Sequence, residues 1–105
     1  MTMELDDKLA HVIGSAKQSG RWKQYWERYT RKQFPKKCQI FGCSNQATDG
    51  AHVWVKHLHQ NFILPTCHAC NVGKEHRYDG SSTDWASAKA NALVVRVEPH
   101  DNTYE

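Results

Sequence analysis

The sequence has no long apolar run, few prolines and no repeated or low-complexity segment. No window of the 105 residues approaches the roughly 20 apolar residues that a helix needs to cross a bilayer, so no membrane association is expected. The first residues, MTMELDDKLAHVIG, carry acids and no apolar stretch, which argues against a secretory signal peptide. These absences predict a soluble, cytoplasmic protein in a reducing compartment.

The chain has only four cysteines, arranged as two close pairs, Cys38 with Cys43 and Cys67 with Cys70. In a reducing compartment, paired cysteines are more often metal ligands than disulfides. Two short cysteine turns can supply the four thiolates of a tetrahedral Zn²⁺ site. We therefore predict a structural zinc ion whose removal unfolds residues 38 to 77.

Three alternatives to this zinc site stay open at this point. Iron in a rubredoxin-like site would use the same four thiolates. The cysteines could instead be buried thiols or form disulfides. His52 or His68 could replace one cysteine as a ligand.

Positive charge is sparse overall and concentrated in one stretch. The net charge is +3, but seven basic residues against one acid, Glu27, give residues 21–37 a formal charge of +6 and leave −3 for the rest. The basic residues are Arg21, Lys23, Arg28, Arg31, Lys32, Lys36 and Lys37. Such a stretch is either a nucleic-acid-binding surface or a solvated helix face.

Apolar periodicity predicts two helices before the first cysteine. Residues 4–13 have helical spacing at Leu5, Leu9, Val12 and Ile13. A second helix is predicted over residues 21–34, ended by Pro35. Its aromatic face should pack on the domain and leave the basic residues outside; that face contains Trp22, Tyr25, Trp26 and Tyr29.

The rest of the chain alternates short β-type runs with polar turns. AHVWV and NFILP, separated by KHLHQ, predict a hairpin, and CHACNVGKEH should open a short helix. Thr83 could cap a further helix, DWASAKAN. ALVVRV predicts a strand, and EPHDNTYE a frayed end.

Between residues 38 and 77, a cysteine pair, AHV, LPTC, CN and a lysine four residues after the last cysteine follow one another in order. This order resembles the HNH, or ββα-metal, endonucleases, and among them the zinc-bearing, endonuclease VII-like kind with a treble-clef core. The resemblance implies a zinc knuckle, a hairpin that carries a histidine, and a helix that supplies an Asn or His.

The resemblance also implies a role for each matching residue. His52 matches the general base that takes a proton from the attacking water. Asn71 matches the helix residue whose side-chain oxygen binds a catalytic divalent ion, Mg²⁺, Mn²⁺ or Ni²⁺, which His76 could also reach. Lys74 matches a basic position that contacts a phosphate.

Two features depart from the family pattern. Ala51 stands directly before His52, where these nucleases usually have an Asp or His that binds the catalytic metal. Asp49 is nearby but would need a turn at Gly50 to point into the site. Asn61, on the second strand, lies one residue from the usual position of the family's middle Asn.

The expected fold is α+β, with an N-terminal helical extension (residues 1–36, with the basic helix) and a zinc-stabilised treble-clef or ββα-metal domain (residues 37–105) that ends in a helix and a strand. The first hypothesis is a divalent-metal-dependent HNH-like endonuclease that hydrolyses phosphodiester bonds. The alternative, favoured by Ala51, is a catalytically inactive zinc module that binds nucleic acid, DNA rather than RNA, or a protein partner. The habits of the family suggest a bacterial or phage origin.

Overall fold

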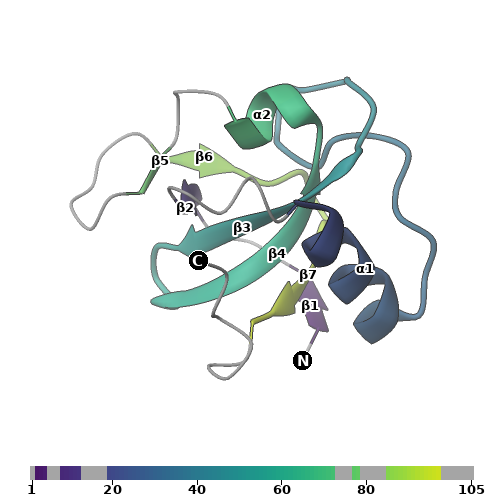
Figure 1. Cartoon of the computed structure of the whole chain (residues 1–105). Coiled ribbons are helices and arrows are strands. Elements are labelled where there is room, and N and C mark those ends of the chain that lie inside the picture. The colour runs from purple at the N-terminus through teal and green to yellow at the C-terminus, as the bar shows by residue number, and fades with distance from the viewer. Residues whose placement is uncertain (1, 5–7, 13–18, 73–76, 79–84, 98–105) are drawn as a thin grey trace.

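A computed structural model describes residues 2–4, 8–12, 19–72, 77–78 and 85–97 of the chain. Its centre is one curled, mostly antiparallel sheet with strand order β1-β7-β4-β3-β2-β5 (Figure 1). The strands on this path are β1 (Thr2–Glu4), β2 (Lys8–Val12), β3 (Asp49–Val55), β4 (Gln60–Thr66), β5 (Arg77–Tyr78) and β7 (Leu93–Arg96). β6 (Ala86–Ser87) pairs with β2, and the helices are α1 (Ser19–Thr30) and α2 (His68–Val72).

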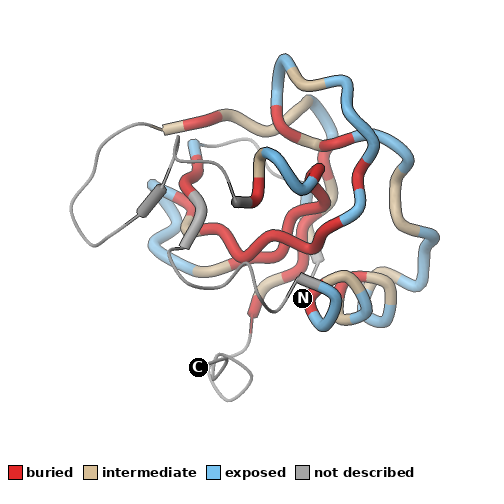
Figure 2. The backbone as a smooth tube through the Cα atoms, turned by 45° about the horizontal axis from the view of Figure 1, so that its top comes forward, coloured by how far each residue is buried: buried red, intermediate tan, exposed pale blue. Residues whose placement is uncertain are grey.

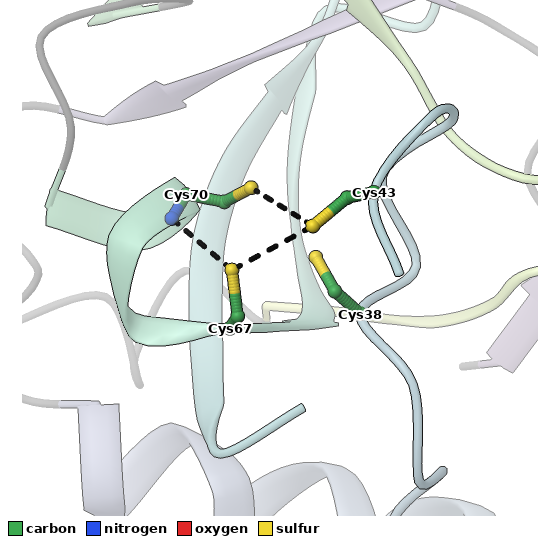
Figure 3. Close-up of side chains that lie close together, drawn as sticks. All are labelled: Cys38, Cys43, Cys67 and Cys70. Atoms are coloured by element: carbon green, nitrogen blue, oxygen red, sulfur yellow. Dashed lines mark hydrogen bonds between the residues drawn. The ribbon is translucent and has the colours of Figure 1, made fainter. Parts of the chain in front are cut away.

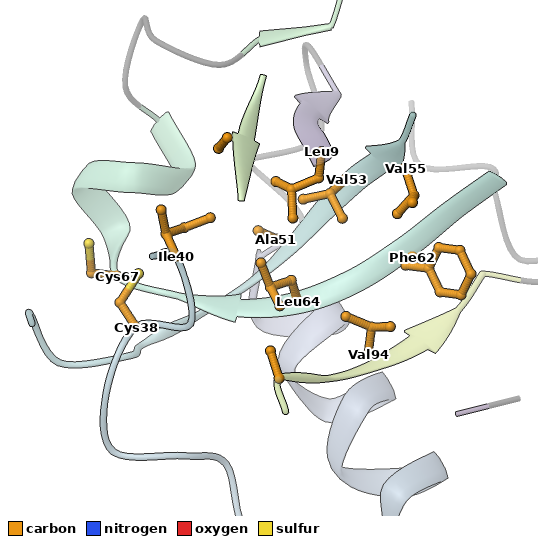
Figure 4. Close-up of a cluster of buried hydrophobic side chains, with 12 residues drawn as sticks. Leu9, Cys38, Ile40, Ala51, Val53, Val55, Phe62, Leu64, Cys67 and Val94 are labelled. Atoms are coloured by element: carbon orange, nitrogen blue, oxygen red, sulfur yellow. The ribbon is translucent and has the colours of Figure 1, made fainter. Parts of the chain in front are cut away.

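The hairpin predicted from AHVWV and NFILP is confirmed as β3 and β4, and both of its faces are buried. Val53 lies opposite Phe62, and these side chains belong to the larger apolar cluster, shown in Figure 4. His52 lies opposite Ile63 on the other face, which α1 covers. Because successive side chains of a strand alternate between its faces, this one hairpin supplies two separate cores.

Trp22, Tyr25 and Trp26 of α1 pack on the sheet, as their spacing predicted, whereas Tyr29, expected on the same packed face, is 44% exposed. Trp22 is fully buried and Trp26 is 3% exposed, and both pack in a cluster with Ile63, Val95 and Val97. The Trp26 Nε1 donates a hydrogen bond to the Leu93 carbonyl at 2.9 Å, which satisfies its polar atom. Two buried indoles and the hydrogen bond of Trp26 fix α1 on the sheet.

The second predicted helix ends earlier than residue 34. The Arg31 amide donates to the Glu27 carbonyl at 2.9 Å, and Arg31 then adopts a left-handed conformation with φ of 57°. That conformation is a common helix C-terminus, so α1 stops at Thr30 rather than at Pro35. Phe34 still reaches back to the helix, with its ring 5.4 Å from that of Trp26.

The helix predicted over residues 4–13 is wrong, because Thr2–Glu4 and Lys8–Val12 are strands. Leu9 and Ala10 pair with Val55 and Trp54 across β2 and β3. An isolated helix of about ten residues is marginal in water, whereas the edge of β3 offers unpaired backbone groups that β2 satisfies. Tertiary pairing therefore outweighs the helical spacing.

The helix predicted over DWASAKAN is also wrong within the described residues, since Ala86–Ser87 forms β6 against β2. Ala88 bridges Ile40, and Asn91 adopts a left-handed turn with φ of 64° just before β7. The strand predicted from ALVVRV is confirmed as β7. Thr83 and the end EPHDNTYE lie outside the described residues.

Strands from both sides of residue 36 lie in the same sheet, and the division of the chain into two domains there stays a prediction. The order of cysteine turn, hairpin and short helix is present, while the treble-clef assignment also stays a prediction. Among the described residues, none of the helices has the length and apolar character needed to cross a membrane.

Candidate metal centre and its surroundings

The four cysteines come from two places in the chain that the fold brings together. Cys38 and Cys43 bracket a tight turn in which the Cys43 amide donates to the Ile40 carbonyl at 3.1 Å. Gly42 has φ of 86°, as the third position of a type II turn requires, and glycine adopts this conformation without steric cost. Cys67 follows β4 directly and Cys70 lies in α2, where the expected short helix is confirmed.

The four Sγ atoms converge within 4.8 Å of one another (Figure 3), as the spacing predicted. The Cys43 Sγ lies 3.8 Å from both the Cys67 Sγ and the Cys70 Sγ. Tetrahedral zinc with Zn–S bonds near 2.3 Å places its sulfurs about 3.8 Å apart, whereas a disulfide needs about 2.05 Å. All four are free thiols, so the cluster could hold a metal such as zinc and contains no disulfide.

The electrostatics of the cluster also suit a cation. Burial raises the pKa of the Cys38 and Cys70 thiols, and the neighbouring cysteines raise the Cys70 pKa further. Burial also raises the Cys67 pKa, but hydrogen bonds from the Cys70 amide and Asn45 outweigh it and lower that pKa to about 7. Four thiolates this close repel one another, and a divalent ion at their centre removes that repulsion.

A buried carboxylate lies beside this metal centre. Asp49, only 6% exposed, accepts hydrogen bonds from Asn71 Nδ2 at 3.0 Å and Thr48 Oγ1 at 2.9 Å, and its Oδ2 lies 2.7 Å from His68 Nδ1. Burial raises the pKa of Asp49, but the bonds from Asn71, His68 and Thr48 prevail and hold it below its usual value. Asp49 therefore ties the start of β3 to α2.

His52, the predicted general base, is only 1% exposed and faces α1. Its ring centroid lies 5.4 Å from that of Trp22. Burial lowers the pKa of His52 to about 4, and a hydrogen bond with the Asn61 side chain opposes that shift. Thus Asn61 does share a face with His52, although it is one residue away from the family position.

The candidate catalytic residues are not all brought together. Asn71 contacts Asp49, while strand alternation directs Asp49 and His52 to opposite faces of β3. The turn at Gly50 that would have aimed Asp49 toward His52 is absent, because Gly50 lies inside the regular strand. Ala51 is fully buried in the apolar cluster. Lys74 and His76 lie outside the described residues.

The basic stretch lies on the outer side of α1 and on the segment that follows it. Lys23 is partly buried, with its Nζ 5.3 Å from the Phe34 ring centroid. The other six are exposed: Arg21, Arg28, Arg31, Lys32, Lys36 and Lys37. Figure 2 shows exposed positions along α1 and along the segment that follows it. We call these six residues the basic surface.

The Asp49–His68 contact is the feature of this site that sequence reasoning missed. His68 sits between two cysteine ligands, and its side chain is 67% exposed while that of Asp49 is 8% exposed. The sequence signal for this contact is an acid at the start of the first hairpin strand. The second strand runs antiparallel and ends opposite that acid, and Cys67 and α2 follow it directly.

Comparison of the chain with models of protein families, with curated proteins and with solved structures finds no match.

Proposed function

We propose that this protein is a metal-stabilised module that binds nucleic acid through the basic surface on α1 and the segment after it. The observation that carries the proposal is the exposure of six cations on one helix and seven following residues, with Glu27 as the single acid of that stretch. Clustered cations attract a polyanion and bind it by releasing its counterions. Zinc in the cysteine cluster would hold the fold and take no part in binding.

The setting of His52 supports binding over cleavage. A general base must come within hydrogen-bond reach of the proton that it removes, directly or through one water molecule. His52 is covered by Trp22 on one face of a buried hairpin, so a phosphate and its attacking water have no route to it in this conformation. Its low pKa keeps the imidazole neutral near pH 7, which suits a packed side chain as well as a base.

The salt dependence of binding tests this proposal. If about four cations contact phosphates of duplex DNA, the plot of log affinity against log salt should have a slope of about −3.6, so affinity falls roughly 100-fold between about 50 and 200 mM salt. Replacing Lys36 and Lys37 by Gln should reduce the slope by about 1.8. Fluorescence anisotropy with a labelled duplex measures both.

The matched control removes the same charge elsewhere on the protein. Lys8 lies on β2 and Lys56 in the hairpin turn, away from α1, and both are exposed. The Lys8→Gln, Lys56→Gln protein should keep the parent slope. If both double variants reduce the slope equally, the protein attracts DNA by its net charge alone. If the affinity does not depend on salt concentration, the partner is a protein rather than nucleic acid.

A second candidate function is metal-dependent hydrolysis of phosphodiester bonds by an HNH-like site. One contact favours it: the Nδ2 of Asn71, the residue that this resemblance assigns to the catalytic ion, donates a hydrogen bond to a buried carboxylate oxygen of Asp49 at 3.0 Å, so the two side chains lie together. Carboxylate and amide oxygens suit Mg²⁺ or Mn²⁺, so Asp49 and Asn71 could hold an ion on the face of β3 opposite to His52. A bound ion of this kind would stabilise charge on the phosphoryl oxygens.

Plasmid nicking separates the two functions. Zinc-loaded protein is incubated with supercoiled plasmid and Mg²⁺, Mn²⁺ or Ni²⁺, beside the His52→Ala and His52→Gln proteins. The buried position of His52 predicts no nicking by any of the three proteins. The contrary result is nicking by the parent protein but by neither variant, with zinc content and DNA affinity unchanged. The protein would then be a nuclease with His52 as its general base, and the proposal of a binding module would be wrong.

A further inference from the structure

The part of the basic surface that lies on α1 has a hollow between its side chains. The hollow has a volume of about 260 Å³ and is lined by Arg21, Gln24, Tyr25, Arg28 and Tyr29. It is smaller than the roughly 300–1,000 Å³ of pockets that enclose drug-sized ligands, and it suits one flat ring rather than an enclosed metabolite. Its lining is aromatic and cationic, without an acid.

The two tyrosines that line this hollow, together with the buried Trp22 beside them, form an aromatic ladder along α1. The Trp22 and Tyr25 rings meet edge to face with centroids 5.3 Å apart, and the Tyr25 and Tyr29 centroids are 4.7 Å apart. The Tyr25 hydroxyl donates to the Arg96 carbonyl at 3.2 Å, which fixes the middle ring against β7. Tyr29, at the outer end of the ladder, remains 44% exposed, so part of its ring is open to a ligand.

Two guanidinium groups flank the tyrosines. Arg28 lies 5.7 Å from the Tyr29 ring centroid, and Arg21 lies 4.8 Å from the ring centroid of Trp22. Arg21 and Arg28 are seven residues apart, so they are separated by about 10 Å along the helix axis. Tyr29 lies at one end of this row, next to Arg28, so a strand with one base stacked on Tyr29 can bring its following phosphates to Arg28 and then to Arg21.

We propose that this hollow binds single-stranded nucleic acid, with one base stacked on Tyr29 and the neighbouring phosphates held by Arg21 and Arg28. The inference deepens the proposed function and rests on it. A single strand offers the open face of a base to an aromatic ring, whereas in a duplex those faces are covered by neighbouring base pairs. A purely phosphate-binding surface would need the cations but not the aromatic ladder.

The test compares two probes on the full, zinc-loaded chain: a labelled thymidine oligonucleotide of about 15 nucleotides, and the duplex that it forms with its adenine complement. Tyr29→Ala should weaken binding of the single strand roughly 10-fold and leave duplex binding within about twofold. Tyr29→Phe keeps the ring and should bind both probes as the parent does. Tyr29→Leu keeps an apolar, helix-favouring side chain without a ring and should behave as Tyr29→Ala.

Other results overturn the inference in distinguishable ways. If the parent binds both probes equally and the Tyr29 variants change neither, the hollow binds phosphates only, and the proposed function stands without it. If Tyr29→Ala and Tyr29→Leu weaken both probes alike, Tyr29 only supports the surface. If the parent binds neither probe, the proposed function itself fails. Zinc content and circular dichroism confirm that each variant is folded.

Discussion

Removal of the metal by a strong chelator is expected to unfold the region around the cysteine cluster. The cluster joins the turn at Cys38 to the end of β4 and the start of α2, which have no other covalent or ionic link to that turn within the described residues. Structural zinc contributes an apparent free energy of about 10–16 kcal/mol in small zinc-binding units, and a typical domain is stable by only about 5–15 kcal/mol. Losing the metal therefore suffices to unfold a chain of this size.

The cluster also belongs to the main core, which enlarges the expected effect. Cys38 is fully buried and Cys67 is 4% exposed, and both pack in the same apolar cluster as Ile40, Leu64 and Val94. Without a cation, these sulfurs become either crowded thiols or unpaired thiolates in an apolar surrounding. The core then loses its packing at the end that holds α2.

Cys67→Ser should lower the free energy of unfolding by several kcal/mol and reduce the bound zinc to well below one ion per chain. Ala92→Ser is the matched control, because Ala92 is 1% exposed in the same cluster and is not a ligand. Burial of the added hydroxyl in the Ala92→Ser protein should lower the free energy of unfolding by only about 1 to 3 kcal/mol, and the protein should retain the metal. Circular dichroism during chelation, zinc titration and metal readdition measure these effects. A chain that keeps its fold after complete metal removal would contradict a structural metal.

Gly50→Ala is expected to destabilise the protein strongly, although it adds a single methyl group. A Cβ at Gly50 would overlap the Lys23 amide nitrogen and the Trp22 carbonyl carbon and lie 2.8 Å from the Trp22 carbonyl oxygen. These are backbone atoms of α1, which cannot turn aside as a side chain can. The helix must therefore move away from the hairpin.

Moving α1 disturbs the second core. Trp22 and Trp26 each remove roughly 200 Å² from water, worth about 5 kcal/mol per residue at about 25 cal/mol per Å². Even partial separation, added to the strain of overpacking, should lower the free energy of unfolding by about 3 kcal/mol or more. Chemical denaturation followed by tryptophan fluorescence measures the loss, and a red-shifted native spectrum would report exposure of the tryptophans on α1.

Gly20→Ala is the matched control for this substitution. Gly20 lies in the first turn of α1, and a Cβ there would meet nothing within 4 Å. The change should raise the free energy of unfolding by up to about 1 kcal/mol, because alanine favours helix. A Gly50→Ala protein as stable as Gly20→Ala would mean that α1 does not lie directly on the hairpin.

The parts of the fold that local patterns determine were predictable from the sequence. Four regularly spaced aromatic residues identify α1, and two β-type runs separated by a short polar tip identify the hairpin. By contrast, β2 forms because it pairs with β3, and β6 forms because it pairs with β2, in both cases with a partner that is distant in the sequence. Short segments such as Ala86–Ser87 carry no periodic signal, so their strand conformation depends on a neighbour that only the fold supplies.

The candidate site also has features that the sequence predicts and features that depend on the fold. Cysteine spacing predicts a cluster without knowledge of the fold, because the chemistry of four thiolates fixes what they can do together. The orientation of His52 depends on the strand register, in which a shift by one residue exchanges the two faces. The contact of Asp49 with Asn71 required both the register and the direction in which α2 leaves β4.

The burial of β3 on both faces has a consequence for how this protein can change over evolutionary time. From Asp49 to Val55, only Trp54 is not fully buried, so nearly every substitution there disturbs one core or the other. The basic surface and the turn at Lys56 can accept many residues without loss of folding. We expect the sequence to drift quickly at those places and slowly along DGAHVWV, so distant relatives would be recognised by this strand and the four cysteines even after their binding surfaces had diverged.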